Sequence, residues 1–383
     1  MRILFISHSS PLKEGGAETR TREVAFRLAR QGHSVTVLYG KTHVEDPEIS
    51  EVNGVKFISR KTLPDFLLRR YPYPHYVSLA AANFFLMFYL RSFLRNERYD
   101  LIREDICPFP PSFLLSLVRL RSRRIAITHM LPSTLRNWVK FYGSIFGPAG
   151  FLMNRLLRAG VLKYDRIISD SRWFAVELER CPAIANKVVF VPNGVNLVDF
   201  KPAERRAMNG EIRLLSVGRL VETKGHRYLL EALSGLVKDY PNIKLDVMGN
   251  GQLRDQLVWL ANDLGLSTHV RFRPPVSHEK MPELYNEYDF FVLPSLWEGL
   301  PVSLIEAMAS KLPVVATKIP AITDVLDATS ATLSSEENAL ELAEKIRWAI
   351  EHPIDVAEYA ERAYEVARMY DWDVTARREI EQA

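Results

Sequence analysis

The sequence contains little cysteine, with Cys107 and Cys181 the only two among 383 residues. Two cysteines exclude a disulfide framework and a cysteine-based zinc site, and they favour a reducing, cytoplasmic setting. Long apolar runs are scarce too, since the longest uncharged span, 71–90, is broken by prolines, a histidine and an asparagine. A membrane-spanning helix needs about 20 mostly apolar residues, so we expect none. The opening MRILFISHSS lacks the length and the cleavage site of a secretory signal.

Core-forming residues, by contrast, are abundant: 47% of the chain is hydrophobic and 25% is charged, which is typical of a globular protein. Strand-like runs alternate with loops and amphipathic helices. The first series is RILFISH, SVTVLYG, VKFISR, DLIRED, RIAITH and RIISDS, and a second series begins at Ile212 with IRLLSVG, IKLDVMG, HVRFR, DFFVLPS and PVVAT. This alternation predicts an α/β fold with two doubly wound domains, whose ligands bind beyond the carboxyl ends of the strands.

We expect an N-terminal domain over 1–190, a C-terminal domain over 191–365 and a last helix over 366–383. Residues 1–190 carry 29 Lys and Arg against 16 Asp and Glu, a net charge of +13, whereas residues 191–383 carry 21 against 30, a net charge of −9. This asymmetry indicates domains with separate partners.

A strand, a loop and a helix start come together in SVGRLVETKG. Gly218 ends the strand, Arg219 follows at once, and Lys224 lies just before the helix. The free N–H groups and partial positive charge of a helix N-terminus attract anions, so two cations beside it suit a diphosphate. The alternative is that both cations are ordinary surface residues of a loop.

Two glutamates stand in the almost wholly apolar run PSLWEGLPVSLIEAMA. We expect Glu298 in the loop after a strand and Glu306 about one turn inside a buried helix. A buried carboxylate is costly without hydrogen-bond donors, and the two hydroxyls of a ribose would supply them. A backbone amide or a buried arginine would serve Glu306 equally well.

Further candidates lie in the first half of the chain. Gly15 and Gly16, in KEGGAE, allow the backbone to approach an anion, although a plain tight turn gives the same pattern. His129 comes directly after the strand-like RIAIT, where a lone histidine is either functional or structural. Glu104 and Asp105, at the end of DLIRED, are open to the same two interpretations.

Taken in order, these loops resemble the retaining glycosyltransferases of family 4, whose GT-B fold has two Rossmann-like domains facing a cleft. The resemblance spans nearly the whole chain. It is strongest in VPNGVNLVDFKP, SVGRLVETKG, VMGNGQLRDQL, LPSLWEGLPVSLIEAMASKLPVVAT and the terminal DWD.

The resemblance implies a hexosyltransferase-type enzyme that moves a sugar from a UDP- or GDP-linked donor to an acceptor hydroxyl without a metal or other cofactor. Arg219 and Lys224 would bind the diphosphate, Glu306 the ribose, and Glu298 the transferred sugar. The implied donor-binding set is Gly15, Gly16, Gly218, Arg219, Lys224, Glu298, Gly299, Leu300 and Glu306, and the implied catalytic set is His129, Arg219, Lys224 and Glu298. Asn193 and Gly194 would join the domains, and the DWD tail would cross back to the first.

Three departures from the family pattern bear on donor choice. Lys311 stands where the family often has a glycine, PAITD at 320–324 replaces a Gly-Gly-x-Pro-Glu loop, and Pro274 replaces another glycine. Losing glycines removes backbone freedom, which we expect to matter near the substrate.

Other function classes fit fewer features. Glu298 and Glu306 are also a candidate acid and nucleophile of a glycoside hydrolase, but a hydrolase has no need of the two cations. A dehydrogenase fingerprint at Gly249-Asn-Gly251 has Arg254 in place of its third glycine. A nucleotide-sugar epimerase shares the two-domain architecture. Nucleic-acid binding rests on the basic first half alone, so we expect no such partner.

Two basic segments, 119–124 and 136–160, suggest a membrane surface. The first is rich in Arg, and the second combines Arg and Lys with Trp138, Phe141, Tyr142, Phe146 and Phe151. Such a mixture suits an anionic bilayer, although a solvated face above core helices has the same composition. On the first interpretation the protein is peripheral on the cytoplasmic membrane face, and a lipid-linked acceptor is the natural hypothesis.

Overall fold

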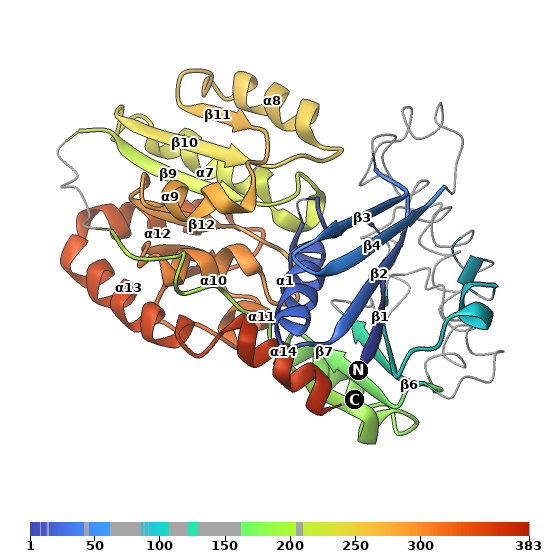
Figure 1. Ribbon diagram of the computed structural model, residues 1–383. Coiled ribbons are helices and arrows are strands. Elements are labelled where there is room, and N and C mark those ends of the chain that lie inside the picture. The colour runs from blue at the N-terminus through green and yellow to red at the C-terminus, as the bar shows by residue number, and fades with distance from the viewer. Residues whose placement is uncertain are drawn as a thin grey trace. The chain divides into compact units, whose positions relative to one another are not determined.

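The computed structural model describes residues 1–7, 9–13, 15–41, 46–61, 86, 89–90, 92–106, 122–128, 162–203 and 210–382. Its contacts divide the chain into two compact units (Figure 1). Unit 1 comprises Met1–Pro192 with Trp372–Ala383, and unit 2 comprises Asn193–Asp371. No helix among the described residues is both long enough and apolar enough to cross a membrane.

Unit 1 contains an eight-stranded sheet in the order β3-β4-β2-β1-β5-β6-β7-β8. Its strands are β1 Arg2–Ser7, β2 Ser34–Gly40, β3 Ile49–Val52, β4 Val55–Arg60, β5 Leu101–Ile106, β6 Arg123–Thr128, β7 Arg166–Ser169 and β8 Val188–Phe190. Only β3, which pairs with β4, runs antiparallel among these strands. The six strands predicted from the first series of apolar runs are all present, whereas β3 was not predicted.

The helices of unit 1 include α1 Gly16–Arg30, α6 Arg172–Glu179 and α14 Trp372–Glu381, together with the short turn η1 Ala185–Lys187. Ser171 caps the N-terminus of α6, where its side chain accepts a hydrogen bond from the backbone N–H of Phe174. Helices α1 and α14, from opposite ends of the chain, lie side by side (Figure 1). The last helix therefore belongs to the same unit as the first.

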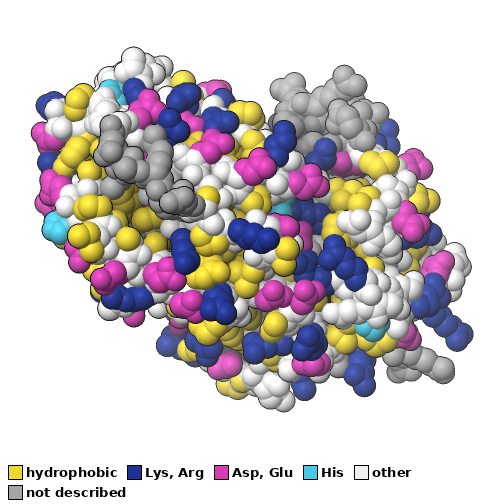
Figure 2. Space-filling model, turned by 60° about the vertical axis from the view of Figure 1, so that its left-hand side comes forward, with side chains coloured by type: hydrophobic (Ala, Val, Ile, Leu, Met, Phe, Trp, Pro, Cys, Tyr) yellow, Lys and Arg dark blue, Asp and Glu magenta, His cyan; other side chains and the backbone are white. Residues whose placement is uncertain are grey.

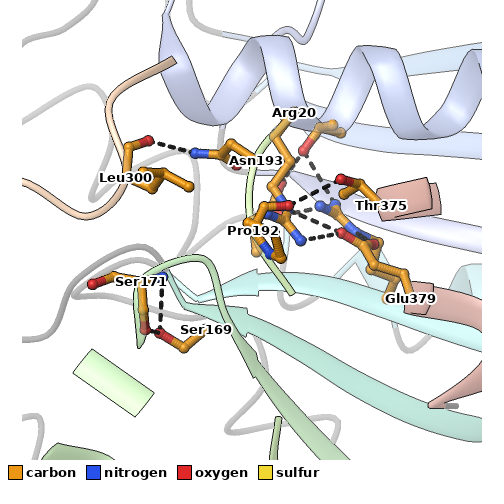
Figure 3. A network of polar contacts seen from close by, with 11 residues as sticks. Arg20, Ser169, Ser171, Pro192, Asn193, Leu300, Thr375 and Glu379 are labelled. Carbon is orange, nitrogen blue, oxygen red and sulfur yellow. Dashed lines mark hydrogen bonds and ion pairs between the residues drawn. The ribbon is translucent and has the colours of Figure 1, made fainter. Parts of the chain in front are cut away.

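A buried ionic network joins α14 to the rest of unit 1. Glu379 accepts hydrogen bonds from Arg20 Nε at 2.9 Å and from Arg103 Nε at 2.9 Å (Figure 3). Arg103 Nη1 also donates to Asp105 at 2.8 Å, and Thr21 donates to the other Asp105 oxygen at 2.7 Å. Burial opposes the charge of Arg103, but the Asp105 and Glu379 carboxylates raise the pKa of its guanidinium above the ordinary value. The network is therefore a set of paired charges.

Unit 2 contains a six-stranded parallel sheet in the order β11-β10-β9-β12-β13-β14. Its strands are β9 Ile212–Val217, β10 Ile243–Met248, β11 Val270–Arg273, β12 Phe290–Leu293, β13 Val314–Thr317 and β14 Thr332–Ser334. Numbered along the chain, this is the 3-2-1-4-5-6 order of a Rossmann-like domain, in which the strand order reverses between β9 and β12. A ligand crevice is expected outside the carboxyl ends of those two strands.

Helices pack on both faces of this sheet (Figure 1). They are α7 His226–Leu236, α8 Arg254–Asp263, α9 Met281–Tyr285, α10 Val302–Ala309, α11 Pro320–Thr323, α12 Ala339–Glu351 and α13 Pro353–Ala367, with the short turns η2 Glu222–Lys224 and η3 His278–Lys280. Residues of α7, α8 and α12 form one hydrophobic cluster, and residues of α9, α10 and α13 form the other. The two clusters cover the faces of the sheet, and loops follow the strands at their carboxyl ends.

Candidate functional site

The loops that follow β9 and β12 meet at the reversal point of the unit 2 sheet. Strands β9 and β12 are neighbours, and the N–H of Leu296 donates to the carbonyl of Thr223 at 2.8 Å. Gly225 lies between η2 and α7 with a φ of 63°, and a Cβ on this residue would collide with the carbonyl oxygen of Pro294. Glycine is needed here both for its positive φ and for the close approach.

Lys224 and Glu298 form an ion pair at this junction. Lys224 Nζ lies 2.5 Å from Glu298 Oε1, and the hydroxyl of Ser295 donates to the same oxygen at 2.6 Å. The Lys224 side chain passes beside Gly218, where an added Cβ would make only ordinary contacts with its methylenes. The side chains of Lys224 and Glu298 are 16% and 8% exposed, so the pair is sheltered but reachable. The structure thus brings together Gly218, Lys224 and Glu298, three of the predicted donor-binding residues.

Glu306 lies inside α10, as the sequence predicts, with both carboxylate oxygens occupied. His278 Nε2 lies 2.8 Å from Oε1, and the hydroxyl of Tyr285 donates to Oε2 at 2.9 Å. Burial, followed by the nearby Glu306 charge, raises the pKa of Tyr285 well above its ordinary value. Tyr285 therefore stays a neutral hydrogen-bond donor.

The protein itself supplies donors to both buried glutamates. Lysine, serine, histidine and tyrosine side chains are these donors, which agrees with the alternative that protein groups satisfy the buried carboxylates. Sequence reasoning missed these partners.

His226, the first residue of α7, is fully buried beside this junction. Burial, and then the positive charge of Lys224, lower its pKa to about 3. The imidazole is therefore neutral at pH 7. His226 therefore adds no positive charge to the partial charge of the α7 N-terminus.

Arg219 follows Gly218 on the exposed surface of the β9 loop. The loop after β10 packs against it, because the backbone N–H of Leu220 donates to the carbonyl of Asn250 at 2.9 Å. A Cβ on Gly249 would collide with Gly218, and one on Gly251 would collide with Leu220. The Gly249-Asn-Gly251 run thus serves close packing of two loops, which accounts for its glycines without a dinucleotide.

Leu300 is buried at the start of α10. Its carbonyl accepts a hydrogen bond from Asn193 Nδ2 at 2.6 Å (Figure 3). Asn193 is the first residue of unit 2, so the chain entry of this unit is tied to the Glu298–Leu300 loop. The partly buried Gly299 lies between Glu298 and Leu300.

The remaining candidates belong to unit 1. Gly16 begins α1 and is exposed, and Gly15 precedes it with a φ of 156°. Glu18 in the first turn of α1 fills the space where a Gly15 Cβ would lie, and it accepts a hydrogen bond from Ser9 Oγ at 2.5 Å. His129 lies outside the described residues. Glu104 accepts a hydrogen bond from the hydroxyl of Tyr164.

The structure corrects one interpretation of the departures from the family pattern. Lys311 was expected near the substrate, but it follows the C-terminal end of α10, at the opposite edge of the sheet from the β9 and β12 loops. Its φ of 50° is the left-handed conformation that favours glycine. By contrast, Pro320 begins α11 directly after β13, at the carboxyl edge.

A polar cavity of about 230 Å³ lies on one face of the same sheet, beside β9, β10 and β11. Its buried carboxylate, Asp246, accepts hydrogen bonds from Tyr288 at 2.6 Å and from Arg273 at 3.1 Å. The charges that line the cavity therefore compensate one another. Among the described residues, no three His, Cys, Asp or Glu side chains form a metal-binding group.

Two family descriptions match this chain along most of its length. Residues 14–199 match "Glycosyltransferase Family 4", and residues 199–368 match "Glycosyl transferases group 1".

Similar proteins cover the whole chain. The D-inositol 3-phosphate glycosyltransferase of Corynebacterium urealyticum is 27% identical over 100% of this chain and 95% of its own length. Sucrose-phosphate synthase from Thermosynechococcus elongatus superposes with a TM-score of 0.86 at 20% identity, over 99% of this chain and 97% of that one. HepE from Anabaena, solved with UDP-glucose, superposes with a TM-score of 0.74 at 17% identity, over 100% and 98%. These structural likenesses confirm the predicted fold class, GT-B with two Rossmann-like domains.

Proposed function

This chain belongs to glycosyltransferase family 4, and on that premise we propose that it is a retaining enzyme that moves a hexose from a UDP- or GDP-linked sugar to an acceptor hydroxyl. The observation that carries the proposal is the Lys224–Glu298 pair, which lies where the loops after β9 and β12 meet at the start of α7. A cation, a carboxylate and a helix N-terminus at this point suit a diphosphate joined to a polyhydroxyl sugar.

The proposed chemistry breaks the bond between the anomeric carbon and the diphosphate oxygen. The acceptor oxygen bonds to the same carbon from the same face, and its proton passes to the departing diphosphate. Negative charge grows on that diphosphate, and Lys224, Arg219 and the N-terminus of α7 would stabilise it. Because two side-chain cations can fill this electrostatic role, we propose that the transfer requires no metal ion.

Other candidate residues also have a proposed role in the donor complex. Glu306 would accept hydrogen bonds from the ribose, and Glu298, with the backbone of Gly299 and Leu300, would hold the transferred sugar. Gly16 and His129 would contribute from unit 1. The neutral His226 supports the assignment to Lys224, since the buried imidazole adds no positive charge beside that lysine.

The site and the similar proteins give less support to the alternative activities, which are hydrolysis, hydride transfer and epimerisation. Every relative reported above for which an activity is named is a transferase or a synthase. Glu298 is paired with Lys224, a cation for which a hydrolase has no need. HepE was solved with UDP-glucose, which makes a UDP-linked sugar the first donor to test.

A thermal-unfolding screen with UDP, GDP, ADP and their common sugars tests the proposal. A ligand present at 100 times its Kd stabilises the native state by about 2.7 kcal/mol, so the true donor nucleotide should raise Tm clearly. Absence of a shift with every nucleotide would overturn the proposed function.

We also propose that the acceptor hydroxyl belongs to a lipid or a lipid-linked glycan. The support is the composition of segments 119–124 and 136–160, of which only 122–124 is described. On the face shown in Figure 2, Lys and Arg side chains are interspersed with Asp and Glu and form no single basic patch. Pelleting with neutral and anionic liposomes is the test. Equal recovery with both, unaffected by salt, would contradict a membrane-associated acceptor.

A further inference from the structure

Glu306 is held by residues from two other elements. His278, in η3, lies 2.8 Å from Oε1, and Tyr285, at the end of α9, donates to Oε2 at 2.9 Å. An ionised carboxylate has no hydrogen to donate, so His278 Nε2 carries the hydrogen in this contact. Each carboxylate oxygen therefore has one protein donor.

The aromatic surroundings keep both donors in place. The ring of Phe200 packs against His278 at 5.7 Å and against Tyr285 at 6.0 Å between ring centroids. Tyr285 is fully buried, whereas the His278 side chain is 20% exposed. Phe200 and Tyr285 are therefore core residues, whereas His278 reaches the surface, and Glu306 contacts both Tyr285 and His278.

The remaining hydrogen-bonding capacity of Glu306 matches a diol. A carboxylate has about four lone-pair sites, two on each oxygen. His278 uses one site on Oε1 and Tyr285 uses one on Oε2, which leaves one site on each oxygen. Two free sites on neighbouring oxygens suit the two adjacent hydroxyls of a ribose, and a sugar with only one of these hydroxyls would leave one site unused.

We propose that His278 and Tyr285 are positioning residues that make the donor site selective for ribonucleotides over deoxyribonucleotides. They act through Glu306, by fixing the rotation of its carboxylate so that both oxygens meet the ribose hydroxyls together. The inference rests on the proposed function, in which Glu306 contacts the ribose of the donor.

The test compares the Kd values of UDP and 2′-deoxy-UDP, and of GDP and 2′-deoxy-GDP, by calorimetric titration. Wild-type protein should prefer the ribonucleotide by at least about tenfold, the factor given by about 1.4 kcal/mol of binding free energy. The His278→Ala and Tyr285→Phe variants should lower this preference to about twofold or less, because a freely rotating carboxylate seldom meets both hydroxyls. The His278→Gln variant, whose amide can donate from a similar position, should restore most of the preference.

Two variants control for damage to the fold. Tyr288→Phe removes another buried tyrosine hydroxyl that donates to a carboxylate, that of Asp246 at 2.6 Å. His269→Ala removes a histidine that contacts a backbone carbonyl, that of Ile243 at 2.9 Å. Both controls should keep the wild-type ribose preference, whatever they cost in Tm.

The possible outcomes separate the inference from the function on which it rests. If wild-type protein binds a nucleotide and His278→Ala and Tyr285→Phe keep the full ribose preference, the positioning role is wrong and the proposed function stands. Equal wild-type affinity for the two sugars would also overturn the inference alone. If no nucleotide binds to wild-type protein, both are overturned.

Discussion

Each unit buries carboxylates, but their partners differ. In unit 1, Glu379 and Asp105 bond to Arg20, Arg103 and Thr21, and all five side chains are within 2% of full burial (Figure 3). Their charges compensate inside the protein, so the network holds α14 against α1 and β5.

In unit 2, Glu298 and Glu306 each bond to one partner that reaches solvent, beside one that is fully buried. Lys224 is 16% exposed and His278 is 20% exposed, and both lie at the carboxyl edge of the sheet. A sheltered pair beside a loop can exchange partners with a ligand, whereas a fully enclosed pair cannot do so without unfolding. The partial exposure of Lys224 and His278 therefore supports the proposed ligand-binding role of Glu298 and Glu306.

We expect the largest effect on stability from a substitution that breaks the buried network around Glu379. Glu379→Ala leaves Arg20 and Arg103 buried without a shared carboxylate, and losing one partner of a buried ion pair typically costs about 3–5 kcal/mol. We expect faster amide hydrogen exchange throughout α1, α14 and β5. Glu381→Ala, at an exposed position of the same helix, is the matched control and should stay within about 0.5 kcal/mol of wild type. Unchanged exchange in Glu379→Ala would show that the network contributes little.

The next effect should appear in catalysis, at the open pair of unit 2. Lys224→Ala removes a cation placed to meet charge that develops on the leaving diphosphate, and losing one such group raises the barrier by about 3–4 kcal/mol. Steady-state turnover should therefore fall by about a hundredfold or more, with a small change in Tm. Lys238→Ala, an exposed lysine of the same unit, is the control. Comparable turnover in the two variants would refute the assignment.

Acid should destabilise unit 2 through His226. Its pKa is about 3 in the folded protein and about 6.5 when unfolded, so the unfolded chain binds the extra proton between these values. Stability contributed by the neutral imidazole is complete above about pH 6.5 and falls by up to about 1.4 kcal/mol per pH unit below it. Denaturation curves at pH 7 and pH 5 should show a smaller pH effect in His226→Gln. An identical pH effect in wild type and variant would contradict the buried, neutral state.

The smallest effect concerns Lys311, remote from both carboxylate sets. Its left-handed φ of 50° costs about 1–2 kcal/mol for a residue other than glycine. The side chain offsets part of this cost through an ion pair with Glu361 at 2.6 Å and a contact 4.6 Å from the ring centre of Tyr364. Lys311→Gly should therefore be close to neutral, and Lys311→Ala should lose about 1 kcal/mol, since it keeps the strain without the contacts. Chemical denaturation would rank the three proteins, and a Lys311→Ala variant as stable as wild type would refute this account.

Most strands of both sheets were predictable because continuous apolar runs such as FFVL and VVAT belong to parallel sheets with both faces covered. Strands β3 and β14 were missed because ISEV and TLS are short, contain polar residues and lie at sheet edges. Glu298 in its loop and Glu306 in α10 were singled out because their surroundings in the sequence are apolar. Their partners were not, because His278 and Tyr285 lie 28 and 21 residues from Glu306 and only the packing of η3, α9 and α10 brings them together.

The most direct test of the central claim is nucleotide binding and turnover in Glu306→Ala and Glu298→Ala, measured with the nucleotide and donor sugar that stabilise the wild-type protein. We predict that Glu306→Ala raises the nucleotide Kd by at least about tenfold, and that Glu298→Ala binds the nucleotide nearly normally but loses most of its turnover. Wild-type affinity in the first variant together with wild-type turnover in the second would contradict the claim that these carboxylates position the donor.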